Sequence, residues 1–341
     1  MKKLLLLLLA GAFVLAGCGG NGKVESLREE LEPSAEEQDI LYPTPLTGLM
    51  TNKKPSSRAV AVVINNHPTA RPQTGLQQAD LVYEVLAEGN MTRFLAIYQS
   101  EQPKKAGPVR SARDYFIELA DGYDSLFIAH GYSPEAKDLL ESGEIDQLNG
   151  IAYDGEFFKR DATRVAPHNS YVSFKGMLDE AEKKGYETER APNGLFFLTQ
   201  PETEALTGKR AEDITITYSD HPSFHTQYVY MPEEKKYKRL TGGEPDIDRE
   251  TKAPIEMENI LIVEADHHII DEQGRLEIDL VSGGKGYFIQ NGFLNEVEWS
   301  NVNGRILPYK DGKPLGFIPG RTWVNIIPAS RGLSEMVDVA N

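Results

Sequence analysis

The sequence contains a single cysteine, Cys18, and this scarcity limits how the folded part can be stabilised. One cysteine cannot form a disulfide within its own chain. The stability of the folded part must therefore come from its core and its polar contacts, even where the surroundings are oxidising.

Positive charge is also scarce. The chain has 36 Lys and Arg against 52 Asp and Glu, a formal net charge of −16. Without residues 1–17, which hold Lys2 and Lys3 and no acid, the charge becomes 34 − 52 = −18. Binding to a nucleic acid backbone requires a basic face, so we expect no nucleic acid partner.

Several catalytic and ligand-binding patterns are missing as well. No nucleophile elbow occurs, and the glycine runs lack the spacing of a phosphate-binding loop. His267 and His268 are adjacent in an expected strand and would point to opposite faces. His221 and His225 have a helical interval, but Pro222 disfavours a helix there. We therefore expect no cofactor and no metal site.

The one long apolar run lies at the N-terminus, in "MKKLLLLLLAGAFVLAGC". Two lysines, an apolar stretch and small residues are typical of a cleaved export signal over 1–17. "LAGC" resembles the bacterial lipobox, which implies lipid modification of Cys18. A plain secretion signal with an incidental cysteine is the alternative. Lipid modification predicts a protein anchored on the extracytoplasmic face of the cell membrane, where two or more chains give stable attachment.

The rest of the chain predicts an α+β protein. Residues 18–50 are acidic and polar and indicate a flexible tether. Residues 51–200 alternate apolar strands with helical patterns, which indicates an α/β domain with a mixed sheet. "AVAVVINN" at 59–66 is typical of a strand buried on both faces, and Ser133 is expected to cap a helix. Residues 201–341 contain short alternating strands and turns, which indicates a smaller, mostly β domain. We expect the boundary between about residues 190 and 212.

A charged hairpin is predicted in the first domain. "ADLVYEVLAEGNMTRFLAIYQ" reads as two strands joined by a turn at Gly89-Asn90. In the register that this turn favours, Glu84, Glu88 and Arg93 share one face of the sheet. Both carboxylates then lie within reach of the guanidinium.

A helix is predicted to begin in "GPVRSARDYFIELA". Ser111 and Asp114 fit the S-x-x-D capping pattern, and Gly122 would end the helix. With a strand expected at 125–131, residues 92–131 should form a right-handed strand, helix, strand crossover.

This helix start would carry two cations, Arg110 and Arg113. Cations are disfavoured at a helix N-terminus unless an anion lies between them. That anion is either the protein's own pair, Glu84 and Glu88, or a bound phosphate or carboxylate.

A second basic cluster lies in "FFKRDATRVAPHNSY", between two predicted helices. Arg160, Arg164 and His168 belong to this loop, and α/β domains often keep functional groups in such loops. The alternative is a solvated loop whose arginines pair with surface acids.

Three segments, "ARPQTGLQQADLVYEVLAEGNMTRFLAIY", "GPVRSARDYFIELA" and "APHNSY", resemble the signature segments of the YerB-like lipoproteins. The resemblance covers about residues 50–330, and it implies two domains of unknown function. The motif residues present here are Arg71, Glu84, Glu88, Arg93, Arg110, Arg113 and His168.

Three functions are compatible with these residues. The first is capture of an anionic cell-envelope ligand through Arg93, Arg110 and Arg113. The second is an enzyme that holds a phosphate with these arginines, while Glu84, Glu88 or His168 acts as a base. The third is an interaction or structural role in which the charged cluster is an internal brace. The sequence identifies no catalytic residue and no protein partner.

The lipid anchor gives the first prediction. Replacing Cys18 by serine removes the acylated thiol, so Cys18→Ser should release the whole protein to the medium. Fractionation of membranes and medium measures the effect. A mutant that still sediments with membranes would show that Cys18 is not the anchor.

Overall fold

The structure is a computed structural model that describes residues 40–340. The predicted signal peptide, Cys18 and most of the predicted tether lie outside this range. No helix in the described range is long and apolar enough to cross a membrane.

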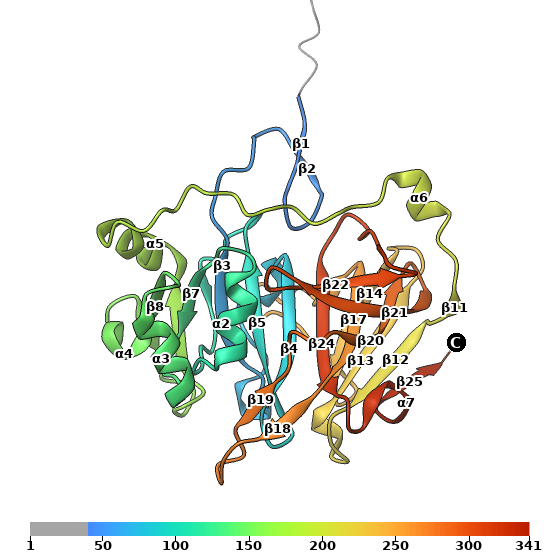
Figure 1. Cartoon of the computed structure of the whole chain (residues 1–341). Coiled ribbons are helices and arrows are strands. Elements are labelled where there is room, and N and C mark those ends of the chain that lie inside the picture. Colours follow the sequence, from blue (N-terminus) through green and yellow to red (C-terminus); the bar gives the residue numbers. More distant parts are fainter. Residues whose placement is uncertain (1–39, 341) are drawn as a thin grey trace, which may run out of the picture. The chain divides into compact units, whose positions relative to one another are not determined.

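A twelve-stranded mixed sheet contains strands from both halves of the described chain (Figure 1). Its strands, in spatial order, are β23 (Lys313–Pro314), β22 (Arg305–Lys310), β21 (Phe293–Val302), β20 (Gly284–Gln290), β17 (Asn259–Ala265), β24 (Thr322–Pro328), β4 (Leu81–Glu88), β5 (Met91–Tyr98), β3 (Val60–Asn65), β7 (Leu126–Ala129) and β8 (Gln147–Asn149), and β11 (Lys209–Arg210) pairs with β21. β24 pairs in parallel with β4, so the sheet continues from the first predicted domain into the second.

The expected fold class is confirmed. The N-terminal half places helices on a mixed sheet, and the C-terminal half is mostly β. β3 is buried at every position, as its β-branched run predicts. The Oγ of Ser133 accepts a hydrogen bond from the Ala136 N–H, so it caps a helix as predicted. The helices are α2 (Asp114–Asp121), α3 (Pro134–Ser142), α4 (Gly150–Tyr153), α5 (Phe174–Lys183), α6 (Gln200–Glu204) and α7 (Gly332–Met336), with 3-10 turns at Pro68–Ala70, Leu76–Gln78 and Pro222–Phe224.

A second, six-stranded sheet packs on the C-terminal part of the large one. Tyr218 and Tyr228 extend from it and donate hydrogen bonds to the Asn325 side chain on β24. Trp299 and Trp323 are buried. The six strands are β15 (Glu244–Pro245), β14 (Lys236–Thr241), β13 (His225–Met231), β12 (Asp213–Thr217), β25 (Val337–Ala340) and β16 (Glu256–Met257).

Three small sheets complete the fold: β6 (Lys105–Ala106) with β10 (Ser170–Ser173) and β9 (Phe158–Arg160), β1 (Tyr42–Pro43) with β2 (Met50–Thr51), and β18 (His267–Ile269) with β19 (Leu276–Ile278). The folded part begins earlier than predicted, because β1 lies inside the expected tether. Leu46 is fully buried and Thr47 nearly so. The last part of the predicted tether, from about residue 41 to residue 50, is therefore folded.

The predicted register of the β4–β5 hairpin is wrong over most of its length. Glu88 pairs with Met91 as expected, but a bulge at Ala87 shifts the partners, so Arg93 faces Val85 and Glu84 faces Phe94. An extra residue in one strand moves every later side chain to the other face. Glu84 and Glu88 therefore lie on opposite faces of the sheet.

The predicted start of helix α2 is also wrong. The N-cap is Arg113, and Ser111 donates its hydroxyl hydrogen to the His130 carbonyl instead of capping. The reason is that the backbone of Ala112 is already paired, with its N–H bonded to Gly131 and its carbonyl to Ser133. The segment stays extended until this pairing ends. The helix does end at Gly122, as predicted.

The expected crossover over residues 92–131 is not formed. β3 lies between β5 and β7 in the sheet, antiparallel to β5 and parallel to β7. The hairpin folds back beside β3, so β3 separates β5 from β7, the two strands of the predicted crossover.

The connection between the halves gives the second prediction. Residues 186–208 run along one edge of the molecule (Figure 1), and Phe196 in it is 59% exposed. Limited chymotrypsin or trypsin treatment should cut between about residues 190 and 212, or in the predicted tether, before it cuts elsewhere. Both fragments should co-elute on size exclusion, because β4 and β24 remain paired. Fragments that separate under native conditions, or early cleavage within β7, would contradict this arrangement.

Candidate functional site

Two of the predicted ligand-binding arginines bind an acid of the protein itself. Both oxygens of the Glu88 carboxylate lie 2.8 Å from Nη2 of Arg93, and Glu88 also pairs with Arg113. Nη1 of Arg93 donates to the Ser111 carbonyl at 2.7 Å. Arg93 is 3% exposed, and burial lowers its pKa to about 10. These contacts are those of an internal brace.

Glu84 belongs to a different cluster. Its Oε2 lies 2.7 Å from Nη2 of Arg239 on β14, which also pairs with Asp246. Oε1 of Glu84 accepts a hydrogen bond from the Thr92 hydroxyl at 2.9 Å, and Oε2 accepts one from the Trp323 indole N–H at 3.3 Å. Burial lowers the pKa of Arg239, but Glu84 and Asp246 offset this effect and hold it above its usual value. Glu84 and Arg239 join the two halves.

Arg71 and Arg164 bind backbone carbonyls. Arg71 donates to the carbonyls of Ser223 and Asn66, both at 2.8 Å. Arg164 donates to the Pro72 carbonyl at 2.7 Å and to that of Ala70. These two predicted site residues hold loops together.

The remaining candidates meet at the carboxyl ends of three parallel strands, β3, β7 and β8. Ligands of open α/β sheets commonly bind at this edge. Asn65 and His67 lie at the end of β3, and His130 follows β7. The extended segment 107–113 crosses the same edge, where the Arg110 N–H bonds to Val63 and its carbonyl accepts from His130. The basic loop adds His168 from the other side.

His67 and His168 stack with ring centroids 4.4 Å apart and an interplanar angle of 26°. Their tautomers follow from backbone donors. The Thr69 N–H donates to Nδ1 of His67, so a neutral His67 carries its proton on Nε2. The His67 N–H donates to Oδ1 of Asn65, so the Asn65 amide nitrogen faces Nδ1 of His168, 2.8 Å away. A neutral His168 therefore also carries its proton on Nε2.

The Nε2–H groups of His67 and His168 have no hydrogen-bond partner among residues 40–340. The contacts of each Nδ1 fix the tautomer of the ring, so each Nε2–H can donate to another molecule. Burial, followed by Arg71 and Arg110, lowers the pKa of His67 below 6.5. Burial, followed by His67, Arg110 and Arg164, lowers that of His168. Both rings are thus mainly neutral donors at pH 7.

Arg110 is the one predicted ligand-binding arginine whose side chain makes no hydrogen bond or ion pair within the described range. It is half-buried. Burial, and then the charge of Arg93, lowers its pKa to about 10. Because its charge also lowers the pKa of His67, His130 and His168, these groups share a positive local potential.

Arg160 lies at the rim of this cluster. It pairs with Asp154 at 2.8 Å, and its Nη2 lies 3.0 Å from Nε2 of His130. Nε2 of His130 must accept here, so Nδ1 donates to the Ser170 hydroxyl at 2.8 Å. His130 is thus fully bonded.

The C-terminal half holds the loops that carry His67 and His168. Arg249 lies 2.5 Å from Asp161 and donates to the Thr163 and Tyr171 hydroxyl oxygens at 2.8 and 3.0 Å. Asp248 accepts the Gly75 N–H. Both ends of the basic loop are therefore fixed by one segment of the second half.

Three residues of this site were missed from the sequence: Asn65, His67 and His130. A signal for them existed, since each lies at the end of a correctly predicted buried strand. Within residues 40–340 no group of three or more His, Cys, Asp or Glu could hold a metal ion.

The buried pair gives the third prediction. Arg239→Ala leaves Glu84 as an unpaired buried charge, so it should lower the free energy of unfolding by about 3–5 kcal/mol. Lys175→Ala breaks an exposed pair with Asp179 and is the control, with an effect of at most about 1 kcal/mol. Chemical denaturation of both variants measures the difference. Equal losses would show that Glu84 and Arg239 do not stabilise the joined halves.

Comparisons with known proteins agree with the two halves of the fold. Residues 46–187 match the N-terminal domain of a family described as "Protein of unknown function (DUF3048)", and residues 214–324 match its C-terminal domain. The chain is 50% identical over 286 residues to "Putative lipoprotein YerB" of Bacillus subtilis (strain 168), covering 83% of this chain and 86% of that protein. The crystal structure of YerB protein from Bacillus subtilis matches with a TM-score of 0.82 and 47% identity, covering 88% of this chain and all of that one. The chain therefore belongs to the DUF3048 family, with a lipoprotein among its relatives.

Proposed function

We propose that this protein is a lipid-anchored lipoprotein on the extracytoplasmic face of the membrane, and that it binds an anionic cell-envelope ligand at Arg110, His67 and His168. The observation that carries the proposal is Arg110, a half-buried cation with no acidic partner within residues 40–340. An oxyanion placed there would receive a charge-assisted hydrogen bond from the guanidinium and could receive two more from imidazole N–H groups.

The charge of the whole molecule makes this site selective. A net charge of −16 repels anions from most of the surface, so an anion can be held only where the local potential is reversed. Arg93 and Arg113, which were expected to bind the ligand, both pair with Glu88, so part of their donor capacity is already used within the protein. The proposed ligand-binding set is therefore smaller than the one expected from the sequence, with Arg110 at its centre.

The location rests on separate support. "LAGC" ends in Cys18 after an apolar run, and the relative from Bacillus subtilis is named a lipoprotein. An anchored protein of this kind meets ligands of the cell envelope. Many of these carry phosphate or carboxylate groups, which match the donors at this site.

Substitution of Arg110 gives the fourth prediction. Arg110→Gln removes the charge and keeps most of the side chain, so affinity for inorganic phosphate or pyrophosphate should fall by about 10- to 100-fold. Isothermal titration measures this change. Arg190→Gln is the matched control, because Arg190 is exposed and pairs with Asp124 elsewhere. Equal affinity in wild type and Arg110→Gln would contradict the proposal.

The pH dependence has a definite sign. Both stacked histidines have a pKa below 6.5, so affinity for sulfate, which stays dianionic, should rise as the pH falls through their pKa values. Without an anion the same depressed pKa values act oppositely on folding. The two histidines contribute to the stability of the folded state above pH 6.5, and this contribution is lost as the pH falls through their folded-state pKa values. Affinity for sulfate that decreases on acidification would argue against the two imidazoles as ligands.

The enzymatic alternative is tested in the same samples. Release of phosphate from a phosphate ester or pyrophosphate by the wild type, and its loss in Arg110→Gln, would favour a phosphate-handling enzyme over a binding protein. For Arg93 and Arg113, the contacts with Glu88 favour the structural alternative.

A further inference from the structure

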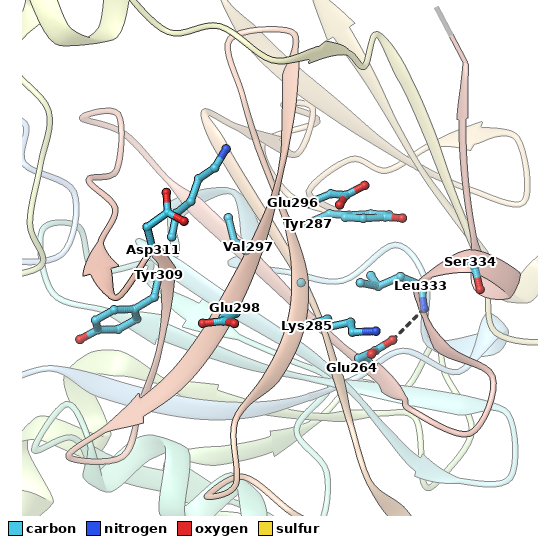
Figure 2. Close-up of a pocket in the computed structure, with 12 residues that line it drawn as sticks. Glu264, Lys285, Tyr287, Glu296, Val297, Glu298, Tyr309, Asp311, Leu333 and Ser334 are labelled. Carbon is cyan, nitrogen blue, oxygen red and sulfur yellow. Dashed lines mark hydrogen bonds between the residues drawn. The ribbon is translucent and has the colours of Figure 1, made fainter.

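A second surface lies away from the anion site, on the large sheet in the C-terminal half. A hollow of about 600 Å³ lies over β20, β21 and β22, with α7 as one wall (Figure 2). This volume is within the usual range for small-molecule sites. The residues that line it are Glu264, Lys285, Gly286, Tyr287, Glu296, Val297, Glu298, Tyr309, Lys310, Asp311, Leu333 and Ser334.

Strand register places the polar side chains in rows on one face. Tyr287 pairs across the strands with Glu296, and Glu298 lies between Lys285 on one side and Tyr309 on the other. Directly opposed residues of antiparallel strands point to the same face. In Figure 2 the Tyr287 ring lies beside the Glu296 carboxylate, and both point toward the side of the hollow that α7 closes.

Three of the charged side chains that line the hollow make no polar side-chain contact with the described residues. Glu296, Glu298 and Lys285 are exposed, and none of them makes an ion pair or a side-chain hydrogen bond to residues 40–340. Glu264 differs, since it accepts the Leu333 N–H at 3.1 Å and so fixes the wall formed by α7. The hollow thus has one fixed wall and a floor of unpaired donors and acceptors.

The charges of the lining restrict its occupant. Four carboxylates line the hollow, those of Glu264, Glu296, Glu298 and Asp311, and they disfavour an anion. The ammonium groups of Lys285 and Lys310 offset half of this negative charge and so weaken the attraction for a polycation. An uncharged ligand with many hydroxyl groups avoids both penalties, because its O–H groups can donate to carboxylates while its oxygens accept from lysine.

The half-buried Tyr287 favours the same ligand. An aromatic ring packs its face against apolar surface, and its hydroxyl can bind a polar group at the edge. A sugar ring offers a C–H face for the first contact and hydroxyls for the second. Burial, followed by the charges of Glu296 and Glu264, raises the pKa of Tyr287, so its hydroxyl stays a donor at neutral pH.

We propose that this hollow binds an uncharged oligosaccharide segment. The Tyr287 ring packs on a sugar face, Glu296 and Glu298 accept from sugar hydroxyls, and Lys285 donates to a sugar oxygen. This site is separate from the anion site, and it does not depend on the function proposed above.

Titration with uncharged tetrasaccharides of N-acetylglucosamine and of glucose tests the proposal on the soluble Cys18→Ser chain. At least one should bind saturably, and Tyr287→Ala and Glu298→Gln should each weaken that binding about tenfold or more. Tyr132→Ala is the matched control, since Tyr132 is 38% exposed and does not line the hollow.

Two further measurements show whether the binding is specific to this hollow. Arg110→Gln should bind the tetrasaccharide as the wild type does, which separates this site from the anion site. Circular dichroism confirms that each variant is folded. Lack of binding by both tetrasaccharides, binding that Tyr287→Ala and Glu298→Gln leave unchanged, or tetralysine binding in place of sugar would overturn the proposal.

Discussion

The buried pair between Glu84 and Arg239 is the interaction on which the joined halves depend. Glu84 is fully buried on β4 in the first half, and Arg239 is 2% exposed on β14 in the second. The guanidinium also lies over the rings of Phe94 and Trp323, with its carbon 5.1 and 4.9 Å from their centroids. Neither charge can be left alone without a large cost, so each half requires the other. The parallel pairing of β24 with β4 places Asn325 beside Glu84, and the six-stranded sheet that packs on β24 supplies Arg239.

The geometry of the proposed anion site depends on the contact between the two halves. His67, Arg110 and His168 all belong to the first half, but the loops of His67 and His168 are held by Asp248 and Arg249 from the second. A site made of loops at a sheet edge is selective only if the loops are held in one arrangement. The second half therefore contributes to the first without lining its site, which gives a physical reason for the two domains to occur in one chain.

Local patterns in the sequence predicted most of the elements, whereas long-range contacts determined the site. The strand at 59–66, the cap at Ser133 and the turn at Gly89-Asn90 depend on neighbouring residues, and each is present. The bulge at Ala87 has no sequence signal of comparable strength, yet it alone moves Glu84 away from Arg93. The partner of Glu84 lies 155 residues further along the chain, a distance that no periodicity reveals. Ser111 failed as a cap because its neighbour Ala112 was already paired with residues beyond β7.

The arginines of the motif segments show how an acidic chain can keep one cation available. Arg93 and Arg113 lie close to Arg110 in the fold, but Glu88 accepts from both, and the bulge sends Glu84 to the opposite face. Without the bulge, Glu84 and Glu88 would share the face of the sheet that carries Arg93. The bulge that the register prediction missed thus removes a second carboxylate from the face that carries Arg93. An external oxyanion at Arg110 then has no carboxylate of the described chain to displace, and the two imidazole donors are already oriented by Asn65 and Thr69.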